Sequence, residues 1–318
     1  MDTLKDIKVG VLGGGVSSER AISLLSANEA YKALRRNNIE TVFIDIATPQ
    51  KEKVKEIILL SNIDLAFIAL HGEFGEDGKI QEILEELDIP YTGSGSRASY
   101  LAMDKIASKE IFIKKAVPTA GFVVYESGCL AEDLFPKLKY PAVVKPFFSG
   151  SSVGVFIVRN KAELETALKK AIALQPKIII EDYIEGREFT VGIFEDTPLS
   201  VVEIVLKNGY FDFTTKYSDG LATFVAPACL DKAVYKKIQD TALAAHRALG
   251  CRHFSRVDIR LGCGCIPYVL EVNSIPGLTT HSLLPLSAKC CGINFDELII
   301  RMAQLALNGK NFKKIRKS

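Results

Sequence analysis

Two short polar patterns near the end of the chain constrain its fold most strongly: Arg256-Val-Asp258 and Glu271-Val-Asn273. Alternation of polar and apolar residues is typical of a strand, and the intervening Gly262–Pro267 is typical of a turn. Side chains two positions apart on a strand face the same way, so each pattern presents its two polar side chains on one face. The sequence therefore predicts a hairpin with a polar face between apolar neighbours.

That polar face predicts a metal site. If residue 261 pairs with residue 268 across the turn, Asp258 lies opposite Glu271, and the arginine lies opposite the asparagine. Two carboxylates and an amide oxygen then converge, and hard oxygen ligands of this kind suit Mg²⁺. The alternative is an ordinary hairpin with acidic side chains in solvent. We favour the metal site, because the polar face runs directly into the Gly- and Thr-rich segment Pro276–His281.

Composition and charge limit the classes of protein. The 318 residues are 48% hydrophobic and 25% charged, which is typical of a soluble protein of two or three domains. A net charge of +2 gives no electrostatic argument for nucleic acid. We see no signal region and no run long enough to span a membrane, and the seven cysteines lack zinc-module or disulfide-framework spacing. We expect a cytoplasmic protein, with no nucleic-acid or membrane partner and with mostly buried, free thiols.

The first part of the chain alternates strand and helix patterns, which predicts an α/β unit with a parallel sheet. A composition break at 91–96 suggests a domain boundary, and we expect one continuous helix from about Ala98 to Lys115. We divide the chain into an N-terminal α/β domain (1–97), a central subdomain (98–185) and a C-terminal subdomain (186–318). The main expected strands are Ile7–Leu12, Thr41–Ile46, Leu65–Leu70, Phe122–Tyr125, Lys177–Glu181, Phe189–Phe194 and Leu199–Leu206, and the clearest helices are Lys51–Leu60, Lys79–Leu87, Lys232–Leu249 and Phe295–Leu307.

Glycine-rich loops follow several of these strands. Gly13-Gly14-Gly15 ends the first strand, but Ser18 stands where a dinucleotide-binding motif needs its third glycine, so the signal for NAD is weak. Glu19 opens the next helix, and taken alone it is best explained as a capping carboxylate. His71-Gly72 follows another buried strand at the end where open α/β sheets bind ligands, although a loop histidine with backbone partners is equally plausible there.

A lysine and a small-residue loop indicate phosphate binding. Lys145 closes an apolar strand and is followed by Gly150-Ser151-Ser152-Val-Gly154. An ammonium group neutralises phosphate charge, while the loop offers N–H and O–H donors. A surface lysine beside a hairpin would look similar, and Lys105 is a second, less distinctive candidate. Downstream, Glu181 to Glu188 follows an apolar strand and could bind adenine and ribose, although a charged linker between domains would look the same. Thr214–Gly220 is a polar loop of the kind that forms lids, and a plain surface loop is the alternative.

In this order and spacing, the segments resemble the D-alanine–D-alanine ligases of the ATP-grasp superfamily over nearly the whole chain. The resemblance implies an ATP-grasp fold with an N-terminal Rossmann-like parallel-sheet domain. Its most specific parts are Ser-Ser-Glu19-Arg, His71-Gly72, Gly150-Ser-Ser-Val-Gly154, Lys216-Tyr217, Arg256-x-Asp258, Glu271-x-Asn273-x-x-Pro276-Gly277 and Thr280-His281-Ser282.

The resemblance also implies a reaction. ATP phosphorylates one D-alanine to an acyl phosphate, and a second D-alanine attacks it to give D-alanyl-D-alanine for peptidoglycan precursor synthesis. It implies two Mg²⁺ ions, with Mn²⁺ as a possible substitute, and a homodimer. Nucleotide-binding residues would be Lys105, Lys145 and Lys216 at the phosphates, Glu181, Tyr183 and Ile184 at adenine, and Glu188 at ribose.

The remaining implied roles concern metal, substrate and catalysis. Tyr217 is the residue expected where the nucleophile is an amine, so we predict a dipeptide product. Rival hypotheses are another ATP-grasp carboxylate–amine ligase, a non-catalytic nucleotide-binding regulatory protein and an NAD-dependent dehydrogenase. The implied metal ligands are Asp258, Glu271 and Asn273. The implied substrate contacts are Glu19 and His71 for the first D-alanine and Ser282 for the second. Arg256 and the Gly277 N–H would hold the oxyanion, and Glu19, Ser151 and Tyr217 would tie the lid to the site.

Overall fold

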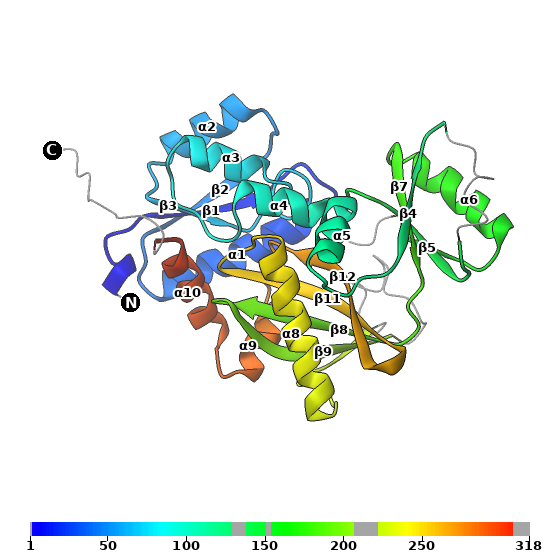
Figure 1. Ribbon diagram of the computed structural model, residues 1–318. Helices are drawn as coiled ribbons and strands as arrows, with labels where there is room; N and C mark the ends of the chain where they lie inside the picture. The colour runs from blue at the N-terminus through cyan, green and yellow to red at the C-terminus, as the bar shows by residue number, and fades with distance from the viewer. Residues whose placement is uncertain (1, 129–137, 151–153, 207–221, 308–318) are drawn as a thin grey trace.

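The computed structural model describes residues 2–128, 138–150, 154–206 and 222–307, and within these ranges three sheets carry the fold (Figure 1). The N-terminal sheet has the strand order β2-β1-β3, and both pairings are parallel because a helix returns the chain between strands. Its elements are η1 (Asp2–Leu4), β1 (Val9–Gly14), α1 (Arg20–Arg36), β2 (Thr41–Ile46), α2 (Lys51–Leu60), β3 (Leu65–Ile68) and α3 (Lys79–Glu86).

Both faces of the N-terminal sheet are covered, so β1 is buried along its whole length. Val11 faces a cluster formed with α1 and the last helix, α10 (Phe295–Leu307), whereas Leu12 faces a cluster formed with α2 and α3. Alternate residues of one strand therefore serve two cores, which explains the unbroken apolar run. Figure 1 shows α10 beside α1, so the end of the described chain packs on its beginning.

The central sheet is antiparallel, in the order β4-β7-β5-β6, and stands at one end of the molecule (Figure 1). Helix α6 (Lys161–Ile172) covers one face, where Val144, Ile178 and Ile180 are buried against it. The opposite face carries Lys145 and Glu181, because alternate strand residues point to opposite sides. The strands are β4 (Phe122–Glu126), β5 (Ala142–Pro146), β6 (Phe156–Val158) and β7 (Lys177–Asp182).

The C-terminal sheet is also antiparallel, in the order β10-β9-β8-β11-β12. Helix α8 (Lys232–Ala248) packs on one face, and α9 (Leu283–Cys290) contacts β8 and β9. A short 3₁₀ turn, Cys263–Cys265, joins the two strands that carry the predicted polar face. The strands are β8 (Arg187–Phe194), β9 (Thr197–Leu206), β10 (Ala222–Val225), β11 (Phe254–Gly262) and β12 (Ile266–Asn273).

The single helix expected from Ala98 to Lys115 is wrong: two helices, α4 (Ser96–Met103) and α5 (Lys105–Lys114), occupy this region. Asp104 separates them with an extended backbone, at φ −78° and ψ 98°. Its carboxylate accepts the N–H groups of Ile106 and Ala107, which are free at the start of α5. The aspartate thus ends one helix and caps the next, and this break places Lys105 in the first turn of α5.

The expectation of mostly buried thiols is also wrong. Of the free cysteines that the structure describes, only Cys251 is shielded, and burial raises its pKa to about 11. The others are exposed because they lie in turns, loops and helix ends: Cys229, Cys263, Cys265, Cys290 and Cys291.

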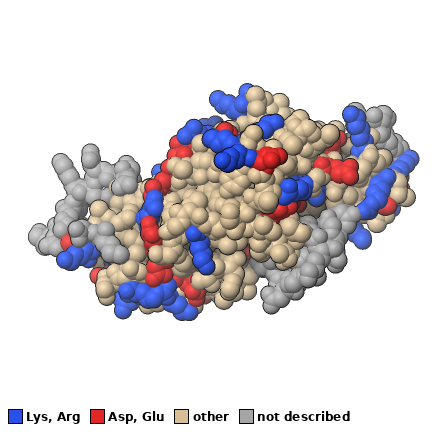
Figure 2. Space-filling model, turned by 90° about the horizontal axis from the view of Figure 1, so that it is seen from below, with Lys and Arg blue, Asp and Glu red and all other residues tan. Residues whose placement is uncertain are grey.

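Two properties of the described part of the chain concern its helices and its surface charge. None of the helices in the described part of the chain is long and apolar enough to cross a membrane. On the face shown in Figure 2, basic and acidic side chains are interspersed rather than gathered by sign.

Candidate active site

The hairpin of β11 and β12 brings the predicted polar residues together. Arg256 pairs with Asn273, and Asp258 pairs with Glu271, as expected. The turn itself differs from the prediction, because residue 261 pairs with 267 rather than 268. A β-bulge reconciles the two, since the next residue after Asp258 pairs with residue 269, and one residue of β12 is left over. The bulge therefore restores the polar register that a regular hairpin with this turn would have lost.

Arg256 and Asp258 form a nearly buried ion pair on this face. Two guanidinium nitrogens of Arg256, Nε and Nη2, donate to the Asp258 carboxylate oxygens at 2.9 and 2.8 Å. Burial works against the charge of Arg256, but Asp258 outweighs it and raises the pKa of the guanidinium. Thr190, opposite Asp258 on β8, donates its hydroxyl to Asp258 Oδ1 at 2.6 Å. The site thus contains a fixed cation beside a fixed carboxylate.

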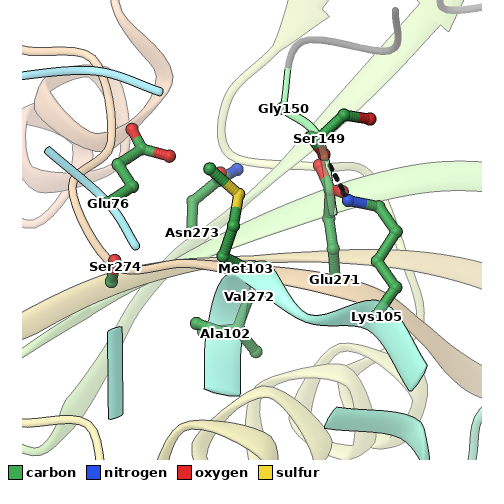
Figure 3. A pocket seen from close by; sticks show the side chains of 10 residues that line it. All are labelled: Glu76, Ala102, Met103, Lys105, Ser149, Gly150, Glu271, Val272, Asn273 and Ser274. Atoms are coloured by element: carbon green, nitrogen blue, oxygen red, sulfur yellow. Dashed lines mark hydrogen bonds and ion pairs between the residues drawn. The ribbon is translucent and has the colours of Figure 1, made fainter. Parts of the chain in front are cut away.

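A small pocket lies along the end of β12. Figure 3 shows Lys105, Ser149 and Glu271 together on one side of it. Lys105 Nζ donates to the Ser149 carbonyl at 2.5 Å and lies 3.4 Å from Glu271 Oε2. Burial lowers the pKa of Lys105 more than the attraction of Glu271 raises it. The lining residues are Glu76, Ala102, Met103, Lys105, Ser149, Gly150, Glu271, Val272, Asn273 and Ser274.

A second charged cluster lies on the face of the central sheet that α6 leaves uncovered. Glu181 Oε1 is 2.9 Å from Lys145 Nζ and 3.2 Å from Lys109 Nζ. Burial disfavours ionisation of Glu181, but the two lysines together hold its pKa below the usual range. Burial likewise lowers the pKa of Lys109 to about 8. The structure therefore brings together Lys145 and Glu181, two of the predicted residues, and adds Lys109, which sequence reasoning missed.

The link from β7 to β8 joins this cluster to the C-terminal sheet. Glu188, at the start of β8, pairs with Arg260 of β11, whose Nε lies 3.7 Å from the carboxylate. The same guanidinium stacks 4.9 Å above the Tyr183 ring. Ile184 packs near Gly262, where an added Cβ would come within 3.0 Å of it. The residues expected at adenine and ribose thus lie where the central sheet meets the C-terminal sheet.

Glu19 precedes α1 but does not cap it, so the capping interpretation is wrong: its side chain accepts no hydrogen bond from the first turn. The carboxylate turns instead toward two glycines. A Cβ on Gly72 would lie 2.6 Å from Glu19 Oε2, and a Cβ on Gly150 would lie 3.0 Å from it. Glycine at both positions makes room for this carboxylate between the loop after β3 and the loop after β5.

His71 is buried beside Glu19's loop, and both of its ring nitrogens have partners. Nε2 lies 2.8 Å from Ser26 Oγ, and Nδ1 lies 3.1 Å from the Ile275 carbonyl and 3.4 Å from Glu76 Oε1. Burial raises the pKa of Glu76 more than its hydrogen bond with His71 lowers it. The ring therefore links the N-terminal sheet to the segment that follows β12.

Gly277 and Ser282 also lie close together. A Cβ on Gly277 would come within 2.9 Å of Ser282 Oγ. That hydroxyl accepts the Thr279 N–H at 3.0 Å and lies 2.8 Å from Thr279 Oγ1, just before α9 begins. Three other predicted residues, Ser151, Lys216 and Tyr217, fall outside the described residues.

The donor set on the hairpin fits a hard divalent cation. Asp258 and Glu271 are cross-strand neighbours and Asn273 lines the same pocket as Glu271, so two carboxylates and an amide oxygen are available. Mg²⁺ commonly binds to few protein ligands and completes its shell with water and phosphate oxygens. Over the residues with described positions, no group of three or more His, Cys, Asp or Glu side chains is placed to hold a metal ion, so the hairpin offers two carboxylates and an amide only.

Sequence analysis did not single out four residues that take part in these contacts: Thr190, Lys109, Ser26 and Glu76. Thr190 could be found only once β8 was paired with β11 in register. Lys109 carried a weak signal, because it follows Lys105 by one helical turn and so shares its face. Ser26 and Glu76 are single polar residues within a helix and a loop, without a local pattern that sets them apart.

Two antiparallel sheets, with a pocket that contains a lysine and carboxylates between their ends, define an enzyme of the ATP-grasp class. The protein-family model of the D-ala D-ala ligase C-terminus matches residues 118–304, and that of the N-terminus matches residues 46–94. The chain belongs to the D-alanine–D-alanine ligase family.

Individual relatives are similar over nearly their full length. The D-alanine–D-alanine ligases of Geotalea uraniireducens and Geobacter sulfurreducens are 43% and 41% identical, over 96% and 97% of this chain and 97% and 98% of theirs. A Bacillus anthracis ligase solved with ATP has a TM-score of 0.83 at 36% identity, covering 95% of this chain and 97% of that one. The VanG D-Ala:D-Ser ligase of Enterococcus faecalis has a TM-score of 0.80 at 29% identity, covering 94% and 99%.

Proposed function

We propose that this chain uses ATP to join two D-alanine molecules into D-alanyl-D-alanine, in the cytoplasm and for peptidoglycan precursor synthesis. One observation carries the proposal: Arg256 and Asp258 share a face with Glu271 and Asn273, and this face borders a pocket that also contains Lys105. Cation, acidic oxygens and lysine in one place are what an acyl phosphate route requires.

The nucleotide lies between the central and C-terminal sheets in this proposal. Lys105 and Lys145 bind its phosphates, and Lys216 reaches the γ-phosphate. Supporting this placement, Lys145 lies 2.9 Å from Glu181, so the phosphate and adenine contacts are neighbours. Adenine is held by Glu181 and by the backbone near Tyr183 and Ile184, and the ribose by Glu188 beside Arg260.

Asp258, Glu271 and Asn273 hold two Mg²⁺ ions, and Mn²⁺ also suits oxygen ligands. When bound, the ions neutralise negative charge on the β- and γ-phosphates. The protein's own share is to fix the ligands: Thr190 and Arg256 hold Asp258, and Lys105 lies beside Glu271. A carboxylate with two partners changes position little when it acquires a third.

D-alanine binds on the N-terminal side of the pocket. Glu19 binds the ammonium of the first D-alanine, with His71 nearby, and Ser282 binds the carboxylate of the second. The support is positional: the Glu19 carboxylate lies beside Gly150, which lines the pocket. We assign Glu19, Ser151 and Tyr217 to a hydrogen-bonded set that ties the lid loop to this subsite.

The chemistry has two steps. A carboxylate oxygen of the first D-alanine attacks the γ-phosphorus, and ADP leaves with the electrons of the broken P–O bond. The amine of the second D-alanine then attacks the acyl carbon, and Arg256 with the Gly277 N–H stabilises the oxyanion. The carbonyl reforms, phosphate leaves with the C–O bonding electrons, and the amine loses a proton. A closed lid protects the acyl phosphate from water.

Substrate specificity is tested by ADP release. D-alanine should support faster release than L-alanine, other carboxylic acids, or D-alanine mixed with D-serine, a combination suggested by the similarity to the D-Ala:D-Ser ligase. Faster turnover with another acid would favour a different carboxylate–amine ligase. Tight ATP·Mg²⁺ binding by calorimetry without ADP release in saturating D-alanine would favour a regulatory protein. We also propose a homodimer, which sedimentation of the purified chain tests.

A further inference from the structure

The backbone segment Ile275–Leu278, which contains Gly277, follows β12 but is anchored in the N-terminal sheet. Ile275 is buried in the cluster on the α2 and α3 side of that sheet, and Leu278 in the cluster on the α1 and α10 side. The two side chains thus enter separate cores on opposite faces. Pro276 and Gly277 lie between these anchors, at the end of the sheet where β3 leads into His71.

A chain of hydrogen bonds closes around the same segment. The Leu278 N–H donates to Ser26 Oγ at 3.2 Å, and Ser26 Oγ lies 2.8 Å from His71 Nε2. His71 Nδ1 faces the Ile275 carbonyl at 3.1 Å, and a carbonyl can only accept. The partners therefore place the ring proton on Nδ1, so Nε2 accepts the Ser26 hydroxyl proton. Each of the three donors in this series of hydrogen bonds therefore has an acceptor.

Burial makes the arrangement sensitive to the loss of one member. Ser26 and Leu278 are fully buried, and His71 is 4% exposed, so water is not available as a substitute partner. Removing the Ser26 hydroxyl would leave both the Leu278 N–H and His71 Nε2 without a partner inside the protein. The segment would then be held by its apolar side chains alone, which fix position less strictly than directional hydrogen bonds.

We propose that Ser26 and His71 act as a clamp that positions the Gly277 N–H for the oxyanion of the coupling step. This inference rests on the proposed role of Gly277. Ser26 does not line the pocket, and its hydroxyl is hydrogen-bonded to Leu278 and His71, so it acts through the backbone at Leu278 and through His71. Both clamp residues belong to the N-terminal part of the chain, and the oxyanion donor belongs to the C-terminal part.

Ser26→Ala tests the clamp, and Ser23→Ala is its matched control. Ser23 is another fully buried serine of α1, one turn earlier, and its hydroxyl donates to the Ala69 carbonyl at 2.8 Å, away from the segment. Hydrogen–deuterium exchange of the Leu278 and Gly277 amides should be about tenfold faster in Ser26→Ala only. The kcat for dipeptide formation should fall about tenfold, with an unchanged KM for ATP and unchanged positional isotope exchange in ATP.

Three outcomes would overturn the proposal: equal effects of Ser23→Ala, unchanged amide exchange, or faster amide exchange without slower coupling. If Ser26→Ala does not fold, Ser26→Cys, which keeps the volume but hydrogen-bonds weakly, should give the same pattern. A wild-type chain that makes no dipeptide would defeat the proposed function, whereas the amide-exchange contrast between the two serine variants would still decide whether the segment is clamped.

Discussion

Thr190 donates its hydroxyl to Asp258 Oδ1 at 2.6 Å, directly across the β8–β11 pair. Arg256 donates to the same oxygen through Nε and to Oδ2 through Nη2, so three hydrogen bonds from two residues define the orientation of the carboxylate. A metal ligand held by outer partners binds its ion in a preset geometry. In the proposed metal site the hairpin therefore supplies the ligands, and β8 fixes one of them.

Thr190→Val removes this hydroxyl at nearly constant volume. We expect about tenfold weaker Mn²⁺ binding in the presence of ATP, because such partners of metal ligands typically contribute that much. Electron paramagnetic resonance of free Mn²⁺ measures the affinity without turnover. Thr41→Val is the control, since Thr41 is a buried strand threonine whose hydroxyl donates to the Ile39 carbonyl. Equal Mn²⁺ affinity in the Thr190 variant would contradict a role for Thr190 in fixing Asp258.

Arg256→Lys keeps a cation but loses the two-pronged contact with Asp258. We expect kcat to fall by about 10², as for other oxyanion donors, with little change in the KM for ATP. Arg301→Lys is the control, because Arg301 makes a similar two-pronged pair with Glu195 on the surface. A kcat for Arg256→Lys equal to that of the control would remove Arg256 from the reaction.

Lys109 predicts a specific pH dependence of stability. Its pKa is about 8 in the folded chain against an ordinary 10.5, because burial disfavours the charge. Between these values the unfolded chain binds the additional proton, so this group makes unfolding less favourable as pH rises from about 8 to 10.5. Below pH 8 both states are protonated and the contribution is constant.

Lys109→Met should remove this rise. Urea unfolding at pH 8 and pH 10 measures it, and the difference between wild type and variant cancels the titrating groups that lie away from Lys109. Wild type should gain about 2 kcal/mol more stability than Lys109→Met over this interval. A parallel pH dependence of the two proteins would show that the Lys109 pKa is not depressed.

Gly72→Ala tests whether a glycine is needed to seat Glu19. An added Cβ would lie 2.6 Å from Glu19 Oε2, so we expect the carboxylate to move and the KM for D-alanine to rise about tenfold. Gly250→Ala is matched in backbone, with the same φ of +72° but nothing within 4 Å of the added Cβ. Both variants should lose about 1 kcal/mol of stability, but only the first should bind D-alanine less well. Equal KM values would separate Glu19 from the substrate.

Local patterns predicted the strands and most helices, because apolar periodicity reports burial directly. The strand Thr41–Ile46 and the helices Lys51–Leu60 and Phe295–Leu307 have the predicted bounds. The helix break at Asp104 was missed, since an aspartate inside an apolar helical pattern reveals its capping role only when its backbone is known.

The candidate site also has features that local patterns predict and features that they do not. The facing of Asp258 and Glu271 follows from strand alternation, although the assumed turn was off by one residue and a bulge compensated. The links through Thr190, Ser26 and Lys109 join segments far apart in sequence, so no local pattern contains them. The prediction of buried cysteines failed for a different reason, because it rested on residue type alone, and residue type does not fix burial in a turn.

The most direct test of the proposed reaction uses D-alanine labelled with ¹⁸O in its carboxylate, incubated with ATP and Mg²⁺. Mass spectrometry should find D-alanyl-D-alanine together with inorganic phosphate that carries one ¹⁸O atom, because the acyl phosphate transfers a substrate oxygen to phosphorus. Dipeptide accompanied by unlabelled phosphate would contradict the acyl phosphate route, and ATP consumption without any dipeptide would contradict ligation of D-alanine.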